Sequence, residues 1–376
     1  MKTHPKNDER RLSGDYGVLP STWIQRAHIG REVERLCQPA SLDLCAGQFY
    51  SMPYSILPGD EPLERFIDRL GSEAPLTQDG KRTLLPLGQV YLARCTQSLD
   101  LPENVFAVAN PKSSVGRADV HVRLLTAKGH SYDRVPKGYK GPIYLEVVAR
   151  SFPVLLDRQA PLAQLRFVMN HLAEVSAEEL AEMHDREPIV RYTPVDSALD
   201  AGIRTDHDDL ILSANTRGAK SEIVGFKARK GAPFLDLAAV GTVDPSKFWT
   251  PLRASDALTL EPSDFYLLRS RELVSIPKNI CAEMVPFDAE AGEFRAHYAG
   301  FFDNGFGANN PSAAVLEVRN HHQVPMRLAH GQPFCRLRFL RFATPPTMAY
   351  GSEIGSHYQG QRLSLSKHFA PWPTSG

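Results

Sequence analysis

Two serines, a lysine and an arginine crowd into one short segment, residues 111–117 (PKSSVGR). A turn of small residues lets backbone N–H groups approach an anion closely, and Ser113 and Ser114 add hydroxyl donors. Lys112 adds a positive charge, and Arg117 offers a planar fork of donors that stays protonated at any working pH. These residue types, so closely spaced, indicate a site for a phosphate group or a carboxylate.

The same segment also fits an ordinary loop between two strands. In that interpretation the serine hydroxyls bond to their own backbone, and the side chains of Lys112 and Arg117 are solvated. Composition alone does not separate the two interpretations, so the choice depends on the rest of the chain.

Two glutamates are embedded in apolar, strand-like runs. Glu146 lies in IYLEVV and Glu317 lies in AVLEVRN. Side chains alternate along a strand, so each glutamate shares its face with an apolar neighbour. A carboxylate in such a place must be paired, protonated or at a boundary between protein units, because burying a lone charge is unfavourable. The plainer alternative is an exposed strand face, on which Glu317 pairs with an arginine.

Length and composition bound the possible functions. The 376 residues suffice for two ordinary domains, and 42% apolar with 23% charged residues is typical of a globular chain. Lysine plus arginine equals aspartate plus glutamate at 43 each, so no excess of positive charge is available to bind a nucleic-acid polymer. The first residues are polar and no apolar run is long enough to span a membrane, which predicts a cytoplasmic protein without a membrane partner.

The five cysteines are scattered along the chain, and none forms a CxxC pair. This usage is typical of reduced core residues in a cytosolic protein. No set of cysteines and histidines has the spacing of a zinc site, so the sequence predicts that the protein works without zinc.

The elements that must position these side chains are mostly short strands. Twenty-nine prolines and 26 glycines interrupt runs rich in valine, leucine, phenylalanine and tyrosine, which favours a mainly β fold. Helical spacing of apolar residues is clearest at residues 171–187. The polar segment 64–82 predicts a surface helix followed by a loop. We therefore expect a mainly β chain with a linking helix at residues 171–187.

The strand-like runs occur twice in the same order. The paired blocks are 38–44 with 231–237, 84–107 with 259–282, 141–156 with 312–328, and 163–167 with 335–339. Four blocks in one order predict a tandem duplication, with a boundary near residues 187–207. We place the first domain at residues 1–200 and the second at residues 201–376.

The repeated blocks resemble the dCTP deaminase branch of the trimeric dUTPase-like superfamily. The resemblance is carried by the opening QPASLDL, the turn PKSSVGR, the strands YLEV and VLEV, and the closing SHYQGQ, which resembles the phosphate-binding tail of that family. It covers roughly residues 17–369 as two copies. It implies two tandem dUTPase-like domains, each a distorted β-barrel or jelly-roll with a few short helices. The family assembles as trimers, with active sites between neighbouring subunits.

The resemblance also implies roles for particular residues. Glu146 would be the proton shuttle, taking a proton from the water that attacks C4 of cytosine and delivering one to N3. Arg117 would be its electrostatic partner, and Ser113 would hold the water or the base. The substrate-binding residues would be Lys112, Ser114, Gln361 and Tyr358. Mg²⁺ would enter only with the nucleotide triphosphate.

The two copies do not keep the same motifs. The first copy has the turn and Glu146, but its hairpin at residues 126–141 is longer and it has no phosphate-binding tail. The second copy keeps Glu317 and the tail, but it has PFDAEAG (286–292) where the first has PKSSVGR. Acidic side chains repel phosphate, so we do not expect a complete second-copy site.

Two arrangements of the site stay open. In the first, first-copy domains trimerise and build sites from Ser113, Arg117 and Glu146, while the second copy lends its tail. In the second, a hybrid site sets the turn of one copy against residues of the other, namely Glu317, Asp303 and Ala299. We favour the first arrangement, in a homotrimer that holds two stacked pseudo-trimers.

The predicted function is zinc-independent, hydrolytic deamination of dCTP to dUTP and ammonia, which serves thymidylate synthesis. A first alternative is pyrophosphate release by a dUTPase or a bifunctional deaminase–dUTPase, in which Asp133 or Asp303 would activate water. A second alternative is a catalytically silent module that binds a nucleotide. The expected partner is in each case a nucleotide such as dCTP or dUTP.

Overall fold

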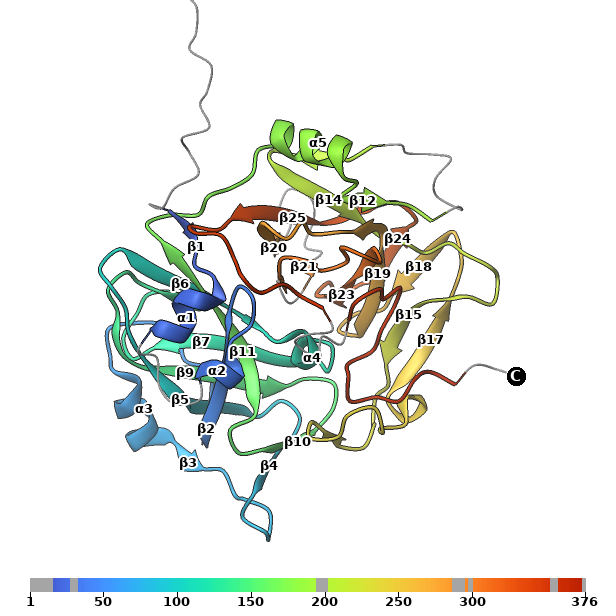
Figure 1. Ribbon diagram of the computed structural model, residues 1–376. Helices are drawn as coiled ribbons and strands as arrows, with labels where there is room; N and C mark the ends of the chain where they lie inside the picture. The colour runs from blue at the N-terminus through green and yellow to red at the C-terminus, as the bar shows by residue number, and fades with distance from the viewer. Residues whose placement is uncertain are drawn as a thin grey trace, which may run out of the picture.

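Short strands dominate the computed structural model, which describes residues 16–27, 33–193, 202–285, 295–296, 300–351 and 358–373. Figure 1 shows the strands of the two halves side by side, with few and short helices. The described helices are α1 (Ser21–Arg26), α2 (Val33–Leu36), α3 (Leu63–Leu70), α4 (Ser113–Gly116), α5 (Ala177–Arg186) and the 3₁₀ turn η2 (Pro245–Lys247). The predicted mainly β fold is confirmed.

The first half forms a sheet whose strand order is β7-β9-β5-β2-β11-β6-β8, with β1 added beside β11 and β3 beside β2. The strands of this half are β1 (Gly17–Val18), β2 (Leu42–Met52), β3 (Ser72–Glu73), β4 (Arg82–Leu85), β5 (Val90–Asp100), β6 (Val105–Pro111), β7 (Val120–Thr126), β8 (Arg134–Val135), β9 (Lys140–Ala149), β10 (Val154–Asp157) and β11 (Pro161–Met169). Because β6 ends at Pro111, the sheet fixes where the serine-rich turn begins.

The second half forms two sheets, ordered β17-β15-β19-β23-β21 and β13-β14-β25-β20-β22, and a separate pair of β18 with β24. Its strands are β12 (Val190–Arg191), β13 (Thr205–Asp206), β14 (Asp209–Ser213), β15 (Ile223–Ala228), β16 (Leu235–Asp236), β17 (Trp249–Arg253), β18 (Ala257–Leu260), β19 (Phe265–Val274), β20 (Ile280–Val285), β21 (Arg295–Ala296), β22 (Phe301–Phe302), β23 (Ser312–Arg319), β24 (Met326–Ala329) and β25 (Pro333–Arg341). Glu317 therefore lies in a strand with neighbours on both sides.

Strand registers agree with the tandem repeat. In the first half, Leu92 of β5 lies opposite Glu146 of β9. In the second half, Leu267 of β19 lies opposite Glu317 of β23, again in an antiparallel pair. The two glutamates are therefore equivalent in strand pairing as well as in sequence.

One of the paired sequence blocks is wrong. Leu42 in QPASLDL lies opposite Leu165, whereas the second-half equivalent of Leu165, which is Leu337, lies opposite Leu210 in β14. The counterpart of QPASLDL is therefore the run that forms β14, and not GAPFLDL. Part of GAPFLDL instead forms β16, which pairs in parallel with β10 of the first half. A Leu-Asp-Leu triplet is compatible with many strands, so its presence in both QPASLDL and GAPFLDL does not make the two segments structurally equivalent.

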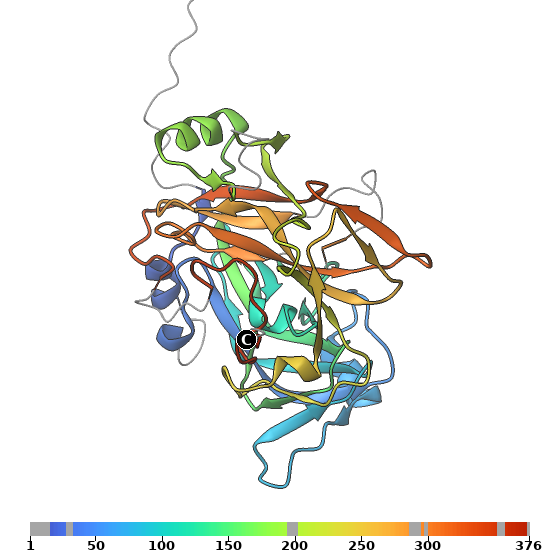
Figure 2. The same cartoon turned by 90° about the vertical axis from the view of Figure 1, so that its right-hand side faces the viewer.

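The linking helix α5 is shorter than the predicted residues 171–187. It begins after Ser176, whose hydroxyl accepts a hydrogen bond from the Glu179 N–H, while the Glu179 carboxylate accepts one from the Ser176 N–H. Leu180 packs into the second-half core, and Figure 2 shows strands of the second half between α5 and the first half. The division of the chain at residue 200 stays a prediction.

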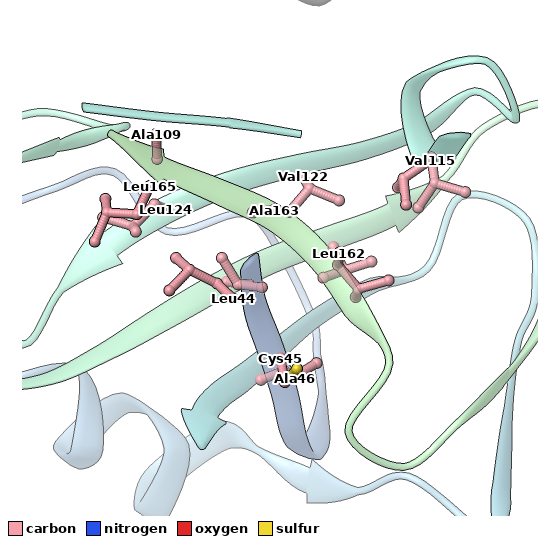
Figure 3. Close-up of a cluster of buried hydrophobic side chains, with 14 of the residues drawn as sticks. Leu44, Cys45, Ala46, Ala109, Val115, Val122, Leu124, Leu162, Ala163 and Leu165 are labelled. Carbon is pink, nitrogen blue, oxygen red and sulfur yellow. The ribbon is translucent and has the colours of Figure 1, made fainter. Parts of the chain in front are cut away.

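One hydrophobic core extends across both halves next to the turn. It contains first-half residues such as Leu44, Val115 and Leu162, which Figure 3 shows at close range. Its second-half members include Phe226, Phe265, Leu267 and Val315. Because Val115 lies within α4, this shared core holds the turn between the two halves.

Candidate active site

A cavity of about 290 Å³ lies between the two halves, beside α4. Its first-half lining includes Asp43, Lys112, Ser113, Ser114 and Arg117. Its second-half lining includes Asp303, Glu317, Tyr350, Tyr358, Gln361 and Lys367. The structure thus brings the predicted turn, the tail residues and two residues of the hybrid arrangement together within one chain.

The serine-rich turn is one turn of helix. The Gly116 N–H donates to the Lys112 carbonyl at 2.9 Å, and the Arg117 N–H donates to the Ser113 carbonyl at 3.0 Å. Val115 is buried in the shared core and anchors the turn from inside. With the turn held in this way, Ser113 and Arg117 line the cavity.

The C-terminal tail holds the Arg117 side chain, which is only 4% exposed. Arg117 Nη1 donates to Gln361 Oε1 and to the Ser364 carbonyl, both at 2.9 Å. The guanidinium carbon lies 3.9 Å from the centroid of the Tyr358 ring. A stacked guanidinium with two hydrogen bonds is fixed in orientation, so its positive charge stays directed into a defined part of the cavity.

Glu317 faces the turn across the boundary between the halves, where Figure 1 shows α4 beside β23. A Cβ atom added to Gly116 would lie 3.0 Å from the Glu317 carboxylate, so the glycine is what allows this close approach. Burial raises the pKa of Glu317 to about 8, the charge of Arg117 lowers it, and Asp119 raises it. Among the described residues, no side chain forms an ion pair with Glu317. Its carboxyl group is therefore free to exchange a proton near neutral pH.

A buried ion pair joins the two halves behind Glu317. Arg319, two positions further along β23, pairs with Asp119 of the first half. Asp119 also accepts a hydrogen bond from Ser151 Oγ at 2.5 Å, and it is completely buried. Burial raises the pKa of Asp119, and the charge of Arg319 lowers it. This cross-boundary pair helps to fix β23 against the turn.

A second charged pair crosses the boundary on the other side of the cavity. Arg166 of β11 is completely buried, and its Nη2 lies 3.8 Å from Asp303 Oδ1. Arg166 Nη1 donates to the Ala282 carbonyl at 3.1 Å, and the guanidinium carbon lies 4.1 Å from the centroid of the Phe301 ring. Burial raises the pKa of Asp303 to about 6, and the charge of Arg166 lowers it. Asp303 thus places a carboxyl group in the cavity lining, next to the aromatic side chains of Phe301 and Phe302.

Two lysines lie close together in the cavity lining. Lys112 forms an ion pair with Asp43 of β2. Lys367, from the C-terminal tail, is half-buried, and its pKa is lowered first by burial and then by the charge of Lys112. Two ammonium groups that repel each other favour the binding of an anion between them.

Sequence reasoning missed five of these charged residues: Asp119 and Arg319 of the buried pair, and Asp43, Arg166 and Lys367. Arg166 and Asp43 lie in the blocks AQLRF and QPASLDL, which served only to recognise the repeat. A charged residue inside an apolar strand was the available signal, and it is the same signal that singled out Glu146 and Glu317. Lys367 follows the SHYQGQ tail, but nothing in its spacing marked it.

Glu146 lies outside this cavity. The residue is 3% exposed, and its carboxylate accepts hydrogen bonds from Ser55 Oγ at 2.7 Å and from the Ile56 N–H at 3.1 Å. Its role as proton shuttle, which needs a turn from another chain, stays a prediction, and the arrangement formed within the chain is the hybrid one. Ala299 and the segment 286–292 lie outside the described residues.

Nowhere in the part of the chain that the structure describes do three or more histidine, cysteine, aspartate or glutamate side chains gather as metal ligands would. All five cysteines are buried and free. No helix among the described residues is long and apolar enough to cross a membrane.

Curated relatives match part of the chain. It is 32% identical over 113 residues to a protein named "dCTP deaminase, dUMP-forming" from Clavibacter michiganensis subsp. michiganensis, a match that covers 29% of this chain and 54% of the relative. It is 31% identical over 115 residues to a protein named "dCTP deaminase" from Natronomonas pharaonis, covering 30% of this chain and 56% of the relative. The chain thus spans about half the length of these relatives.

Comparison with solved structures and with family models covers most of the chain. The crystal structure of 2'-deoxycytidine 5'-triphosphate deaminase from Agrobacterium tumefaciens is 34% identical and superimposes with a TM-score of 0.79, covering 88% of this chain and 97% of that one. The model for the N-terminal domain of 2'-deoxycytidine 5'-triphosphate deaminase (DCD) matches residues 15–171, and the model for the C-terminal domain matches residues 176–369. The chain belongs to the 2'-deoxycytidine 5'-triphosphate deaminase (DCD) family.

Proposed function

We propose that this protein hydrolyses dCTP to dUTP and ammonia at the cavity between its two halves. The proposal rests on the placement of two buried residues from different halves, Glu317 and Arg117, in the lining of one cavity. The names of the relatives support the same substrate. The hybrid arrangement supports Glu317, rather than Glu146, as the residue that moves protons.

The cavity offers separate chemistry for the base and for the phosphates. Its aromatic lining includes Phe301, Phe302 and Phe306, which suits the flat faces of a pyrimidine. Lys112 and Lys367 supply positive charge, and Ser113 and Ser114 supply hydroxyl donors, as a triphosphate requires.

The proton-transfer steps follow from the raised pKa of Glu317. At neutral pH its carboxyl group carries a proton, which it donates to N3 of cytosine. The resulting carboxylate takes a proton from a water molecule as the water oxygen bonds to C4. Glu317 then passes that proton to the amino nitrogen, the C4–N bond breaks, and its electron pair leaves with ammonia. As the C4 carbonyl forms, its hydroxyl proton returns to Glu317.

Arg117 has a supporting role in these steps. A fixed positive charge next to Glu317 stabilises the carboxylate that forms when N3 takes its proton. Burial alone would hold Glu317 protonated, and Arg117 alone would hold it ionised. The two opposing influences leave the carboxyl group with a pKa close to the working pH, where proton exchange in both directions is easiest.

We propose that Mg²⁺ takes part only as a companion of the triphosphate. Lysines and hydroxyls fit phosphate oxygens, whereas the carboxylate of Asp43 already pairs with Lys112. The donor set near the lysines is therefore better suited to phosphate than to a metal ion, and the metal would be held through phosphate oxygens and water.

A second candidate function is dUMP formation, in which pyrophosphate is released as well. Two observations favour it: a relative at 32% identity carries the words "dUMP-forming" in its name, and the cavity contains a second carboxyl group, that of Asp303. With its pKa raised to about 6, Asp303 is largely ionised at neutral pH and can take a proton from water.

One assay separates these functions. The purified chain is incubated with dCTP and Mg²⁺, ammonia and pyrophosphate are measured separately, and the nucleotides are resolved by chromatography. Ammonia with an equal amount of dUTP supports deamination alone, and equal ammonia, pyrophosphate and dUMP support the bifunctional reaction. Release of neither product contradicts both, and dCTP binding without turnover would favour the silent nucleotide-binding module.

A further inference from the structure

The two halves carry equivalent apolar faces around their glutamates. Tyr50 lies opposite Leu92 in the first half, and Phe226 lies opposite Leu267 in the second. These registers, together with the pairing of Glu146 with Leu92 and of Glu317 with Leu267, identify four equivalent apolar positions in each half. The first-half residues Tyr50, Val90, Leu92 and Tyr144 correspond to Phe226, Phe265, Leu267 and Val315.

In the second half, this face is covered by the first half. All four of its residues belong to the core cluster that contains Val115 of α4. Trp249, on the neighbouring strand β17, packs edge-on against Phe152 of the first half, with ring centroids 5.3 Å apart. The face around Glu317 is thus an interface between repeats.

In the first half, the same face is covered by a segment of its own repeat. Leu92 and Tyr144 belong to a separate small cluster with Ile56 and Leu63, and Tyr50 and Val90 pack against it. Phe66, Ile67 and Leu70 of α3 complete this cluster. Figure 1 shows α3 on the side of the first half away from β15 and β17. We call residues 53–70 the cap.

Hydrogen bonds fasten the cap between residues 55 and 63. Ser55 Oγ and the Ile56 N–H donate to Glu146, and the Tyr132 hydroxyl donates to the Ile56 carbonyl at 2.6 Å. Further along, the Leu63 N–H donates to the Ala127 carbonyl at 3.1 Å and the Gly129 N–H to the Gly59 carbonyl at 3.2 Å. The cap is thus bound to its own repeat through its backbone as well as its side chains.

We propose that the cap replaces a neighbouring repeat on the first half, so that each chain holds a single nucleotide site. Over Glu317 lies the backbone of α4 from the other repeat, and over Glu146 lie the hydroxyl of Ser55 and the N–H of Ile56. Glu146 is thereby a hydrogen-bond acceptor that holds the cap, and the face around it is closed to a third repeat.

The first half also lacks two of the aromatic residues that we propose to contact the base in the second half. Register equivalence places Arg134 and Val135 where the second half has Phe301 and Phe302. Two of the three aromatic residues are therefore replaced in the first half, whereas Tyr139, whose carbonyl accepts from the Leu101 N–H as that of Phe306 accepts from Ile276, keeps the third position. A trimer made through first-half domains would need the cap to leave Glu146, at the expense of its hydrogen bonds and of its apolar contacts.

The stoichiometry of nucleotide binding tests the proposal, which relies on the proposed function only for the choice of probe. Calorimetric titration of the full chain with a non-hydrolysable α,β-imido analogue of dUTP and Mg²⁺ should give one site per chain. Two sites per chain would overturn the proposal. No binding would instead contradict the proposed function, and the cap would then be judged by the exchange experiment below.

Hydrogen exchange with a matched pair of variants tests the cap directly. Ser55→Ala combined with Tyr132→Phe removes side-chain hydrogen bonds that fasten the cap, so amide exchange in residues 53–70 should become about tenfold faster, as expected for a loss of about 1.4 kcal/mol. Tyr54→Phe is the control, because Tyr54 is exposed. Turnover of dCTP should be unchanged in both. Exchange in the wild-type cap as fast as in an unstructured peptide, or no change in the double variant, would overturn the proposal.

Discussion

Glu146 and Glu317 occupy the same strand position in two copies of one fold, yet their surroundings differ. Glu146 accepts hydrogen bonds from a hydroxyl and a backbone N–H of its own repeat. Glu317 lies in a cavity opposite the glycine of a turn from the other repeat, with a fixed arginine nearby. Duplication therefore kept the residue type, while the segment that covers the strand decides what the residue can do.

The two glutamates differ physically in how many hydrogen bonds their carboxyl groups accept from the protein. A buried carboxylate whose oxygens are already bound stabilises the fold and has no capacity left for a substrate. A buried carboxyl group without such donors has a raised pKa and is available to a ligand, which is typical of a reactive residue.

The largest effect is expected from removing the proton shuttle. Glu317→Gln keeps the size of the side chain but cannot exchange protons, so kcat for dCTP should fall by about 10²–10⁴-fold. Glu146→Gln should leave kcat within about threefold of wild type, because an amide oxygen still accepts hydrogen bonds from the cap. Steady-state ammonia release measures both.

The opposite outcome would reverse the comparison. If Glu146→Gln abolishes turnover while Glu317→Gln does not, the active site is built by first-half domains of different chains, as the sequence favours. Circular dichroism of both variants should match wild type, so that any loss of activity reflects the site rather than unfolding.

The second largest effect is expected from Arg117, because its charge acts on Glu317 and not on Glu146 within the chain. Arg117→Ala should lower kcat/KM by about 10²–10³-fold, as the loss of a preorganised charge commonly does. Arg117→Lys keeps the charge but loses the planar fork that bonds Gln361 and Ser364, so it should restore only part of the activity. Equal activity of the alanine and lysine variants would show that the charge of Arg117 does not act on the reaction.

The sequence predicted much of this molecule because several of its signals are local. Proline, glycine and alternating apolar residues gave the mainly β fold, and clustered hydroxyls and cations gave the turn. The choice between Glu146 and Glu317 could not be predicted, since both lie in nearly identical strands. It depends on the cap, whose helix α3 fits a surface helix in sequence although Phe66 and Ile67 pack inward. Long-range packing of this kind leaves little trace in local sequence.

A smaller effect is expected in the pH dependence of stability. The pKa of Glu317 is raised to about 8 in the folded state, against about 4.3 in an unfolded chain. Between these values the folded state holds a proton that the unfolded state has lost, so the free energy of unfolding falls as pH rises. The slope is at most about 1.4 kcal/mol per pH unit and vanishes above the folded pKa.

Comparison of wild type with Glu317→Gln isolates this contribution. Denaturant unfolding between about pH 6 and pH 9 gives the free energy for each protein, and the difference between the two should fall with rising pH until about pH 8. Asp303 also has a raised pKa, but it is present in both proteins and cancels in the difference. A pH-independent difference would mean that Glu317 is ionised like an exposed carboxyl group.

The smallest effect tests the contact that the two glutamates do not share. A methyl group at Gly116 would lie 3.0 Å from the Glu317 carboxylate, so Gly116→Ala must displace the carboxylate slightly without straining the backbone. Small misplacements of a catalytic group reduce the rate, and we expect kcat to fall by about tenfold with little change in KM. Gly202→Ala is the control, because nothing lies within 4 Å of its added methyl. If Gly116→Ala kept full activity, the close approach of the turn to the Glu317 carboxylate would not be required for the reaction. That contact would then not explain why Glu317, rather than Glu146, is the catalytic glutamate.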